Sequence, residues 1–278
     1  MSNADQAEFW TDVAGHKWVT HQHGMDATLA PVLDLVLAEA DLQTGEHVLD
    51  IGCGAGTSTF AAADYVGDQG RVTGLDISPT LLKHARTQAA DKPQARFVQA
   101  DAQTHAFDHA YDVMISRFGV MFFADTTAAF ANITKGLKSC ARMIMAAWGP
   151  APQNPWFMDA AAVASDVMGK PPKTDRTLPG PFAFEDAQRV VRMLEAAGLQ
   201  DVKCDAKSLH LTPSGSAYDV ALQSTHIGPA QSILSLFEGN EADRMRIAKT
   251  LANTFASYGT ADGLRIPAVI NLITARAP

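Results

Sequence analysis

The sequence predicts an α/β fold built on a doubly wound, mostly parallel sheet. Short apolar or β-branched segments alternate with stretches of helical length, which is typical of βαβ units. A glycine-rich turn follows the first of these segments directly. Ligands of such sheets bind beyond the carboxyl ends of the strands, so functional residues are expected there. The predicted strands of this series are 47–51, 71–76, 95–101, 111–116 and 142–148.

Local sequence patterns predict where helices begin and end, both between these strands and outside the series. Ser78 followed by Pro79 predicts a helix N-terminus, and Asp125 predicts another. Apolar spacing predicts a helix over 25–40 that packs on the sheet, and Pro31 predicts that this helix starts late. A further helix covers 190–194, and Gly198 is expected to end it.

The last third of the chain predicts two more strands and two insertions. Segment 201–211 alternates, but its apolar phase changes between Ala206 and Leu209, which predicts a bulge or bend. Segment 266–275 is the last strand, and Pro267 indicates an edge or a strand start. The predicted units are a helical lid segment (1–44), a core (45–150), a helical insertion (151–183), a core helix and strand (184–214), a second helical insertion (215–262) and the last core strand (263–278).

Composition narrows the classes of function. The 278 residues carry 22 basic and 30 acidic side chains, a net charge of −8, without a basic run, so nucleic acid is not expected as a partner. Three widely separated cysteines disfavour a disulfide framework or a zinc site, and a reducing cytoplasm fits best. No uncharged run approaches the roughly 20 residues needed to span a bilayer. A homodimer is an open possibility.

The stretch VLDIGCGAGTS, residues 48–58, differs from a dinucleotide-binding loop. The dinucleotide pattern is G-x-G-x-x-G, whereas glycines stand here at 52, 54 and 56 and Thr57 takes the third place. Asp50 immediately precedes the loop, where its carboxylate would repel a pyrophosphate and attract a cation. The loop therefore favours a ligand with positive charge.

Two further acids end the next predicted strands. Asp76 is placed to hold both hydroxyls of a ribose, and Asp101 ends the third strand. A nicotinamide cofactor explains Asp76 but not Asp50. S-adenosylmethionine carries an ammonium and a sulfonium as well as an adenosine, so it accounts for all three acids.

The segments VLDIGCGAG, GLDISPTLL, FVQADAQ and YDVMISRFGVMFF resemble, in order and spacing, the motifs of class I S-adenosylmethionine-dependent methyltransferases. The small-molecule branch, which includes the ubiquinone/menaquinone biosynthesis methyltransferases, is the most similar group, and the resemblance covers roughly 45 to 150. It implies a Rossmann-like seven-stranded sheet whose last strand is antiparallel, with helical cap insertions. It also implies a set of cofactor-binding residues: Asp50, Gly52, Cys53, Gly54, Gly56, Asp76, Ile77, Leu81, Asp101, Ala102, Ser116 and Arg117.

The sequence departs from the family at two places. Ser139-Cys140-Ala141 replaces the usual Pro-Gly-Gly turn before the fifth strand, which is away from the site. Met121, Phe122 and Phe123 stand where the quinone-pathway enzymes carry an Arg-Asn pair, which puts a quinone precursor in doubt. The segment SRFG also lacks the motif of enzymes that methylate nucleic-acid bases.

Methyl transfer from a sulfonium is an in-line displacement, so it needs no dedicated nucleophile. The candidates for a catalytic side chain are His23, Arg117 and His226, although a structural ion pair is an equal alternative for Arg117. His21 and His23 lie two residues apart and would face different sides of a helix, so no metal site is expected. The acceptor pocket is expected under a lid that also includes Phe9, Trp10 and Phe157, and its predicted lining is Trp18, Phe118, Trp148, Trp156 and His226.

The predicted function is S-adenosylmethionine-dependent methylation of a small-molecule acceptor, with S-adenosylhomocysteine as the product. Two alternatives stay open from the residues alone. One is a non-catalytic S-adenosylmethionine-binding regulator or partner subunit, because its donor motifs would be the same. The other is an NAD(P)-dependent oxidoreductase, which the missing third glycine disfavours.

Overall fold

The computed structural model describes residues 2–107 and 111–278. Met1, in the predicted lid segment, and residues 108–110, in the predicted core, lie outside the described residues. The main sheet has seven strands in the order β3-β2-β1-β4-β5-β9-β6. Their bounds are β1 His47–Ile51, β2 Arg71–Asp76, β3 Ala95–Gln99, β4 Tyr111–Arg117, β5 Leu137–Trp148, β6 Gln200–Leu211 and β9 Ile266–Arg276. A short hairpin joins β7 Gly259–Thr260 to β8 Gly263–Leu264.

The pairing confirms the predicted fold class. Strands β1 to β5 pair in parallel, while β9 runs antiparallel to both β5 and β6. Pro267 is the second residue of β9, which is an inner strand, so the proline marks the strand start rather than an edge. Strand β5 begins at Leu137, before the predicted residue 142, because its irregular beginning pairs Leu137 with Tyr111.

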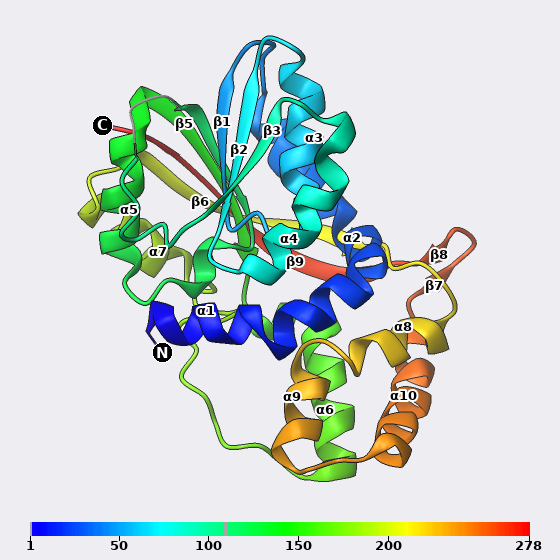
Figure 1. The fold of residues 1–278 in the computed structure, drawn as a ribbon. Helices are drawn as coiled ribbons and strands as arrows, with labels where there is room; N and C mark the ends of the chain where they lie inside the picture. The colour runs from blue at the N-terminus through cyan, green and yellow to red at the C-terminus, as the bar shows by residue number, and fades with distance from the viewer. Residues whose placement is uncertain (1, 108–110) are drawn as a thin grey trace.

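Helices cover both faces of the sheet. The helices are α1 Asn3–Thr11, α2 Val13–Ala40, α3 Thr57–Val66, α4 Pro79–Gln88, α5 Thr126–Ile133, α6 Pro155–Met168, α7 Ala187–Ala196, α8 Ala217–Ser224, α9 Pro229–Leu236 and α10 Glu241–Ala256. Helices α2, α3 and α4 lie on one face and α5 and α7 on the other (Figure 1). Helices α6, α8, α9 and α10 contact one another in a group beyond the carboxyl ends of the strands, and α1 lies across the same edge (Figure 1).

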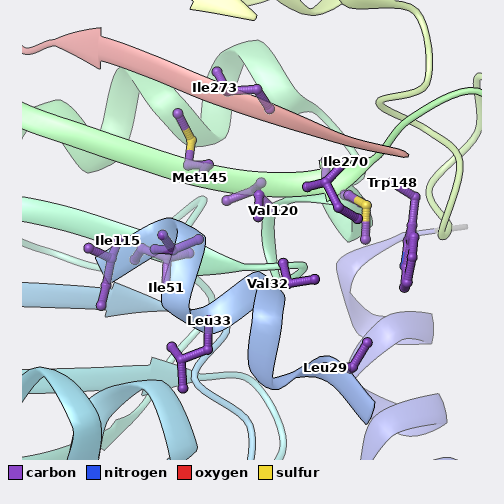
Figure 2. Packing of buried hydrophobic residues seen from close by; sticks show 14 of the residues in the cluster. Leu29, Val32, Leu33, Ile51, Ile115, Val120, Met145, Trp148, Ile270 and Ile273 are labelled. Carbon is purple, nitrogen blue, oxygen red and sulfur yellow. The ribbon is translucent and has the colours of Figure 1, made fainter. Parts of the chain in front are cut away.

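Side chains of α2 and the central strands form much of the buried core. Figure 2 shows Val32 and Leu33 of α2 on the side of Ile51 and Ile115 and Leu29 on the side of Trp148, all 9% exposed or less. Burial of each such side chain contributes about 1.5–3 kcal/mol relative to exposure. The core therefore fixes the strand ends, which carry the candidate site, on a rigid base.

The expectation that the helix around Pro31 starts late is wrong. Helix α2 begins at Val13 and continues through Pro31 to Ala40. A proline inside a helix lacks the N–H that would bond to the carbonyl four residues earlier, here that of Ala27. The Thr212 hydroxyl donates to this carbonyl at 3.0 Å instead. A residue far along the chain thus satisfies the acceptor that Pro31 leaves free.

The predicted bulge between Ala206 and Leu209 is also wrong. Strand β6 pairs with β9 without interruption from Lys203 to Leu211, and the irregularity lies earlier, between Gln200 and Lys203. Successive side chains of a strand lie on opposite faces of the sheet. The apolar side chains of β6 change face along the strand because helices pack on one face near its start and on the other face near its end. Helices α7 and α2 both contact β6, α7 near Cys204 and α2 just beyond Leu211.

The predicted helix caps are confirmed. The Ser78 hydroxyl accepts a hydrogen bond from the Leu81 amide, and the Asp125 carboxylate accepts one from the Ala128 amide. Gly198, with φ +94°, follows α7. Among the described residues, no helix combines the length and apolar character that crossing a bilayer requires.

Candidate active site

The strand order brings the three predicted acids to one edge of the sheet. Asp50 is the second-to-last residue of β1, and Asp76 ends β2. Strand β3 ends at Gln99, so Asp101 lies just beyond this strand rather than at its end as predicted. Strands β3, β2 and β1 are consecutive neighbours, so their carboxyl ends lie side by side. The glycine turn after β1 is tied to β2 by hydrogen bonds from the amides of Gly52 and Cys53 to the Leu75 carbonyl at 2.8 and 3.2 Å.

The three glycines of this turn have positive φ but different surroundings. A Cβ on Gly52 would lie 2.5 Å from Gly119 Cα, and a Cβ on Gly56 would lie 2.8 Å from the Phe60 ring. No atom lies within 4 Å of the position that a Cβ on Gly54 would take. Gly52 and Gly56 are therefore required by packing, and Gly54 leaves open space that a ligand can approach.

Asp50 is fully buried. The hydroxyls of Ser58 and Thr59 both donate to Asp50 Oδ2 at 2.6 Å, whereas Oδ1 has no hydrogen-bond partner among the described residues. Burial raises the pKa of the Asp50 carboxyl to about 6, although the two hydroxyls and the Arg117 guanidinium oppose this rise. A buried oxygen without a donor is costly, which makes Oδ1 a candidate for ligand binding.

Asp76 holds the glycine turn and the start of α4 together. Its carboxylate accepts hydrogen bonds from the amides of Gly54 and Ser78, both at 2.8 Å. Burial raises the pKa of this carboxyl despite these bonds. Burial also raises the pKa of the neighbouring Cys53 thiol well above its usual range, so the thiol stays protonated. Ile77 is half-buried and Leu81 buried beside this acid.

Asp101 has a partner that the sequence did not indicate. Asn3 Nδ2 donates to both carboxylate oxygens of Asp101, at 3.0 and 2.9 Å, and to Gln103 Oε1 at 3.0 Å. The Ala124 amide donates to Asn3 Oδ1 at 2.9 Å. The capping box of Ser2 and Asp5 is a readable signal for a helix start at Asn3, but no local pattern connects this helix with Asp101.

Arg117 forms a structural ion pair, which was the predicted alternative to its roles as a catalytic and a cofactor-binding residue. Its Nη2 lies 3.0 Å from Asp26 Oδ1 on α2, while Nη1 is buried without a hydrogen-bond partner in the described part of the chain. The Thr57 hydroxyl donates to Asp26 Oδ2 at 2.7 Å, and Gln22 Nε2 donates to that hydroxyl at 3.3 Å. Asp26, Thr57 and Gln22 were missed because only the tertiary fold joins α2 to the loop.

Two other predicted cofactor residues lie at the same edge. Ser116 is buried, and its hydroxyl donates to the Ile51 carbonyl at 2.7 Å, which joins the ends of β4 and β1. Ala102 is 4% exposed and directly follows Asp101. With Asp50, Asp76 and the glycine turn, they form a continuous rim along β3, β2, β1 and β4.

The aromatic side chains predicted for the acceptor pocket belong to separate groups. Phe118 stacks on Trp148 with ring centroids 4.5 Å apart, and Phe118 has the unusual φ of +68° for a bulky residue. Trp18 lies edge-on to Trp10 at 6.2 Å. Trp156 instead stacks on Phe255 at 5.9 Å inside the insertion and is 5% exposed, which is a core contact.

The two histidines that are catalytic candidates also lie in different surroundings. His226 stacks on His21 of α2 with centroids 4.9 Å apart. His23 is exposed. Within residues 2–107 and 111–278, no group of three or more histidine, cysteine or acidic side chains is arranged to hold a metal ion.

The fold and the rim of acids define a class: Rossmann-like α/β proteins with a glycine turn and acidic strand ends that favour a cationic adenosine ligand. Residues 48–140 match the family described as methyltransferase domain. The resemblance to class I S-adenosylmethionine-dependent methyltransferases is thereby confirmed.

Curated relatives agree with this assignment. The chain is 40% identical over 92 residues to the aklanonic acid methyltransferase DauC of Streptomyces sp. (strain C5), covering 32% of this chain and 42% of the relative. It is 34% identical over 117 residues to the ubiquinone/menaquinone biosynthesis C-methyltransferase UbiE of Teredinibacter turnerae, covering 41% and 47%. The chain thus spans less than half of the length of these relatives.

A solved structure extends the likeness in fold to most of the chain. The structure titled putative methyltransferase from an antibiotic biosynthesis pathway of Anabaena variabilis superposes with a TM-score of 0.61. The match covers 88% of this chain and 96% of that one at 14% identity. At this identity the comparison shows the fold alone.

Proposed function

We propose that the protein transfers a methyl group from S-adenosylmethionine to a small-molecule acceptor and releases S-adenosylhomocysteine. One observation carries this proposal. Asp50 Oδ1 and Arg117 Nη1 are both buried at the strand ends without hydrogen-bond partners among the described residues. The amino-acid tail of the cofactor has an ammonium that needs an acceptor and a carboxylate that needs a donor, so these two atoms complement it.

The adenosine end fits the remaining rim residues. Each carboxylate oxygen can accept more than one hydrogen bond, so Asp76 can accept from ribose hydroxyls while it keeps the amides of Gly54 and Ser78. Leu81 and Ile77 would pack on the adenine, and Ala102 would face its ring. Asp101 would accept from the adenine amino group, which requires that Asn3 leave this carboxylate.

When bound, the cofactor supplies an electrophilic methyl group on a sulfonium. The chain's own contribution is to hold donor and acceptor in line, which can provide a large part of the acceleration. The half-buried Phe118 ring, stacked on the buried Trp148 ring, supplies an apolar surface next to β4, which supports an apolar or aromatic acceptor. We assign no general base, because the need for one depends on the acceptor.

Composition supports two further proposals, one on the kind of partner and one on the location of the protein. A net charge of −8 supports a small molecule rather than nucleic acid as the partner. The few, unpaired cysteines support action in the cytoplasm. A homodimer stays a prediction, which sedimentation velocity of the purified protein can check.

Calorimetric titration with S-adenosylhomocysteine tests the proposal. We expect saturable heat for the wild type and at least tenfold weaker binding for Arg117→Met, because a charge-assisted hydrogen bond contributes about 1.5–3 kcal/mol. Asp26→Asn breaks the same ion pair but keeps the guanidinium, so it should bind more tightly than Arg117→Met. Arg192→Met, on the exposed side of α7, is the matched control.

Two outcomes would overturn the proposal. A wild-type protein that releases no heat on titration would show that it does not bind this cofactor. Wild-type binding without transfer of labelled methyl to any compound of a cell extract would instead favour a non-catalytic binding protein.

A further inference from the structure

Basic side chains from three elements meet between α2 and the second insertion. Lys17 and His21 lie one helical turn apart on α2, His226 lies between α8 and α9, and Arg244 belongs to α10. We call these four residues the basic cluster. The rings of His21 and His226 are stacked with an interplanar angle of 20°. Arg244 donates to the carbonyl of Thr225, the residue before His226.

The basic cluster has little opposite charge around it. Within the described residues, Lys17, His21 and His226 form no ion pair, and Arg244 pairs only with Glu241, whose side chain is 74% exposed. Burial and the neighbouring cations lower the pKa values of Lys17, His21 and His226, while Glu241 alone opposes this for His226. Lys17 and Arg244 therefore have only the exposed Glu241 carboxylate as a counter-charge within the described residues, and both histidines can become cationic when a bound anion raises their pKa values.

The cluster lies next to the proposed cofactor site. Gln22, adjacent to His21, donates to the Thr57 hydroxyl directly after the glycine turn. One turn further, Asp26 pairs with Arg117. Helix α2 therefore contacts the cofactor loop through one side and the insertion through another. His226 and Arg244 lie outside residues 48–140, which match the methyltransferase domain.

We infer that the basic cluster binds an anionic group, a carboxylate or a phosphate, of the methyl acceptor. This inference rests on the proposed function, since it names the class of acceptor. The Lys17 ammonium carries three donors that can bind such a group, and both histidines can donate once protonated. The anion would supply the charge that the cluster lacks, and its placement between α2 and the insertion would orient the acceptor toward the cofactor loop.

Nuclear magnetic resonance of the histidine rings in the 278-residue chain tests the inference. Sodium benzoate and inorganic phosphate serve as separate probes, with S-adenosylhomocysteine present. We expect one of them to cause saturable shifts of His21 and His226 and to raise the pKa values of both, while exposed His210 stays unchanged. Lys17→Met should weaken this binding at least tenfold, and Lys249→Met, exposed on α10, should not.

The probe that binds identifies the source of the anion, because benzoate reports a carboxylate and phosphate reports a phosphate. Absence of shifts with both probes would overturn the inference, as would equal loss in Lys17→Met and Lys249→Met. Calorimetry with S-adenosylhomocysteine separates the two proposals. Intact cofactor binding without anion binding defeats this inference alone, whereas anion binding without cofactor binding defeats the methyltransferase proposal.

Discussion

Asp50 is a buried carboxylate whose two oxygens have different surroundings. Its carboxylate keeps two hydroxyl donors on one oxygen and none on the other. Burial disfavours the ionised form, which is why its pKa rises to about 6. A cation that arrives at this carboxylate would restore the lost solvation, so the cost of burial in the free protein becomes affinity in the complex.

This pKa predicts a pH dependence of cofactor binding. Between pH 5 and 7 the affinity for S-adenosylhomocysteine should rise, approaching tenfold per pH unit below about 6, because the ionised Asp50 carboxylate binds the ammonium. Calorimetry at stepped pH measures this. Asp50→Asn should bind weakly and without this slope, whereas Asp112→Asn, at the opposite end of the sheet, should keep it.

The same shift acts on stability with the opposite sign. A carboxyl whose pKa is raised by folding binds its proton more tightly in the folded state. Its contribution to the free energy of unfolding is therefore fully present below the unfolded pKa of 3.8 and is lost as the pH rises through about 6.

For the affinity prediction, an S-adenosylhomocysteine affinity that does not change between pH 5 and 7 would contradict the role of Asp50.

At the scale of elements, α1 and α2 close over the strand ends. The hydroxyls of Ser78 and Thr80 donate to the carbonyls of Trp10 and Thr11 at 2.7 and 2.6 Å, which attaches the end of α1 to the start of α4. A Cβ on Gly15 would lie 2.0 Å from the Trp10 carbonyl oxygen, so only glycine allows α2 to start in this position. Asn3 attaches the other end of α1 to Asp101.

The attachment of α1 predicts that Asn3 competes with adenine. Asn3→Ala should tighten S-adenosylhomocysteine binding by several-fold up to about tenfold, because the Asp101 carboxylate becomes free in a larger fraction of molecules. Glu8→Ala, exposed on the same helix, is the control for general loosening of α1. Weaker binding of Asn3→Ala in the calorimeter would mean that Asn3 contacts the bound cofactor rather than competing with it.

The sequence predicts elements well where one local pattern decides them. The strands that end at Ile51 and Asp76 and the caps at Ser78 and Asp125 are of this kind. It fails where a distant residue decides. Helix α2 continues through Pro31 because Thr212 donates to Ala27, and the phase change in β6 reflects helices packed on opposite faces.

The candidate site follows the same division. Asp50, Asp76 and Asp101 were predictable because each lies at or near the end of a strand pattern, and parallel strands end at one edge. Their partners were not, since Asn3 and Asp101 are separated by 98 positions and Arg117 and Asp26 by 91. No periodicity or cap connects residues at such distances.

At the scale of the whole molecule, the candidate site combines strand ends, covering helices and an insertion. The rim comes from β1, β2, β3 and β4, and its cover from α1 and α2 (Figure 1). The basic cluster joins Lys17 and His21 of α2 to His226 and Arg244 of the second insertion. A ligand that joins these parts stabilises the folded state over the unfolded chain, because the unfolded chain has no site. The cofactor should therefore act on global stability as well as on local contacts.

Thermal unfolding makes this a quantitative prediction. A ligand at 100 times its dissociation constant adds about 2.7 kcal/mol to the free energy of unfolding. For a chain of this size, about 2 °C per kcal/mol gives a rise in Tm of about 5 °C with S-adenosylhomocysteine, and NADH at equal concentration should give none. Asp76→Asn should have a lower Tm than the wild type, since the Gly54 or Ser78 amide loses its acceptor. It should also lose most of the rise in Tm that S-adenosylhomocysteine causes. The shift, not the baseline Tm, reports the site, because packing defects lower both curves equally. Stabilisation by NADH instead would favour the oxidoreductase alternative and reassign Asp76 to a nicotinamide nucleotide.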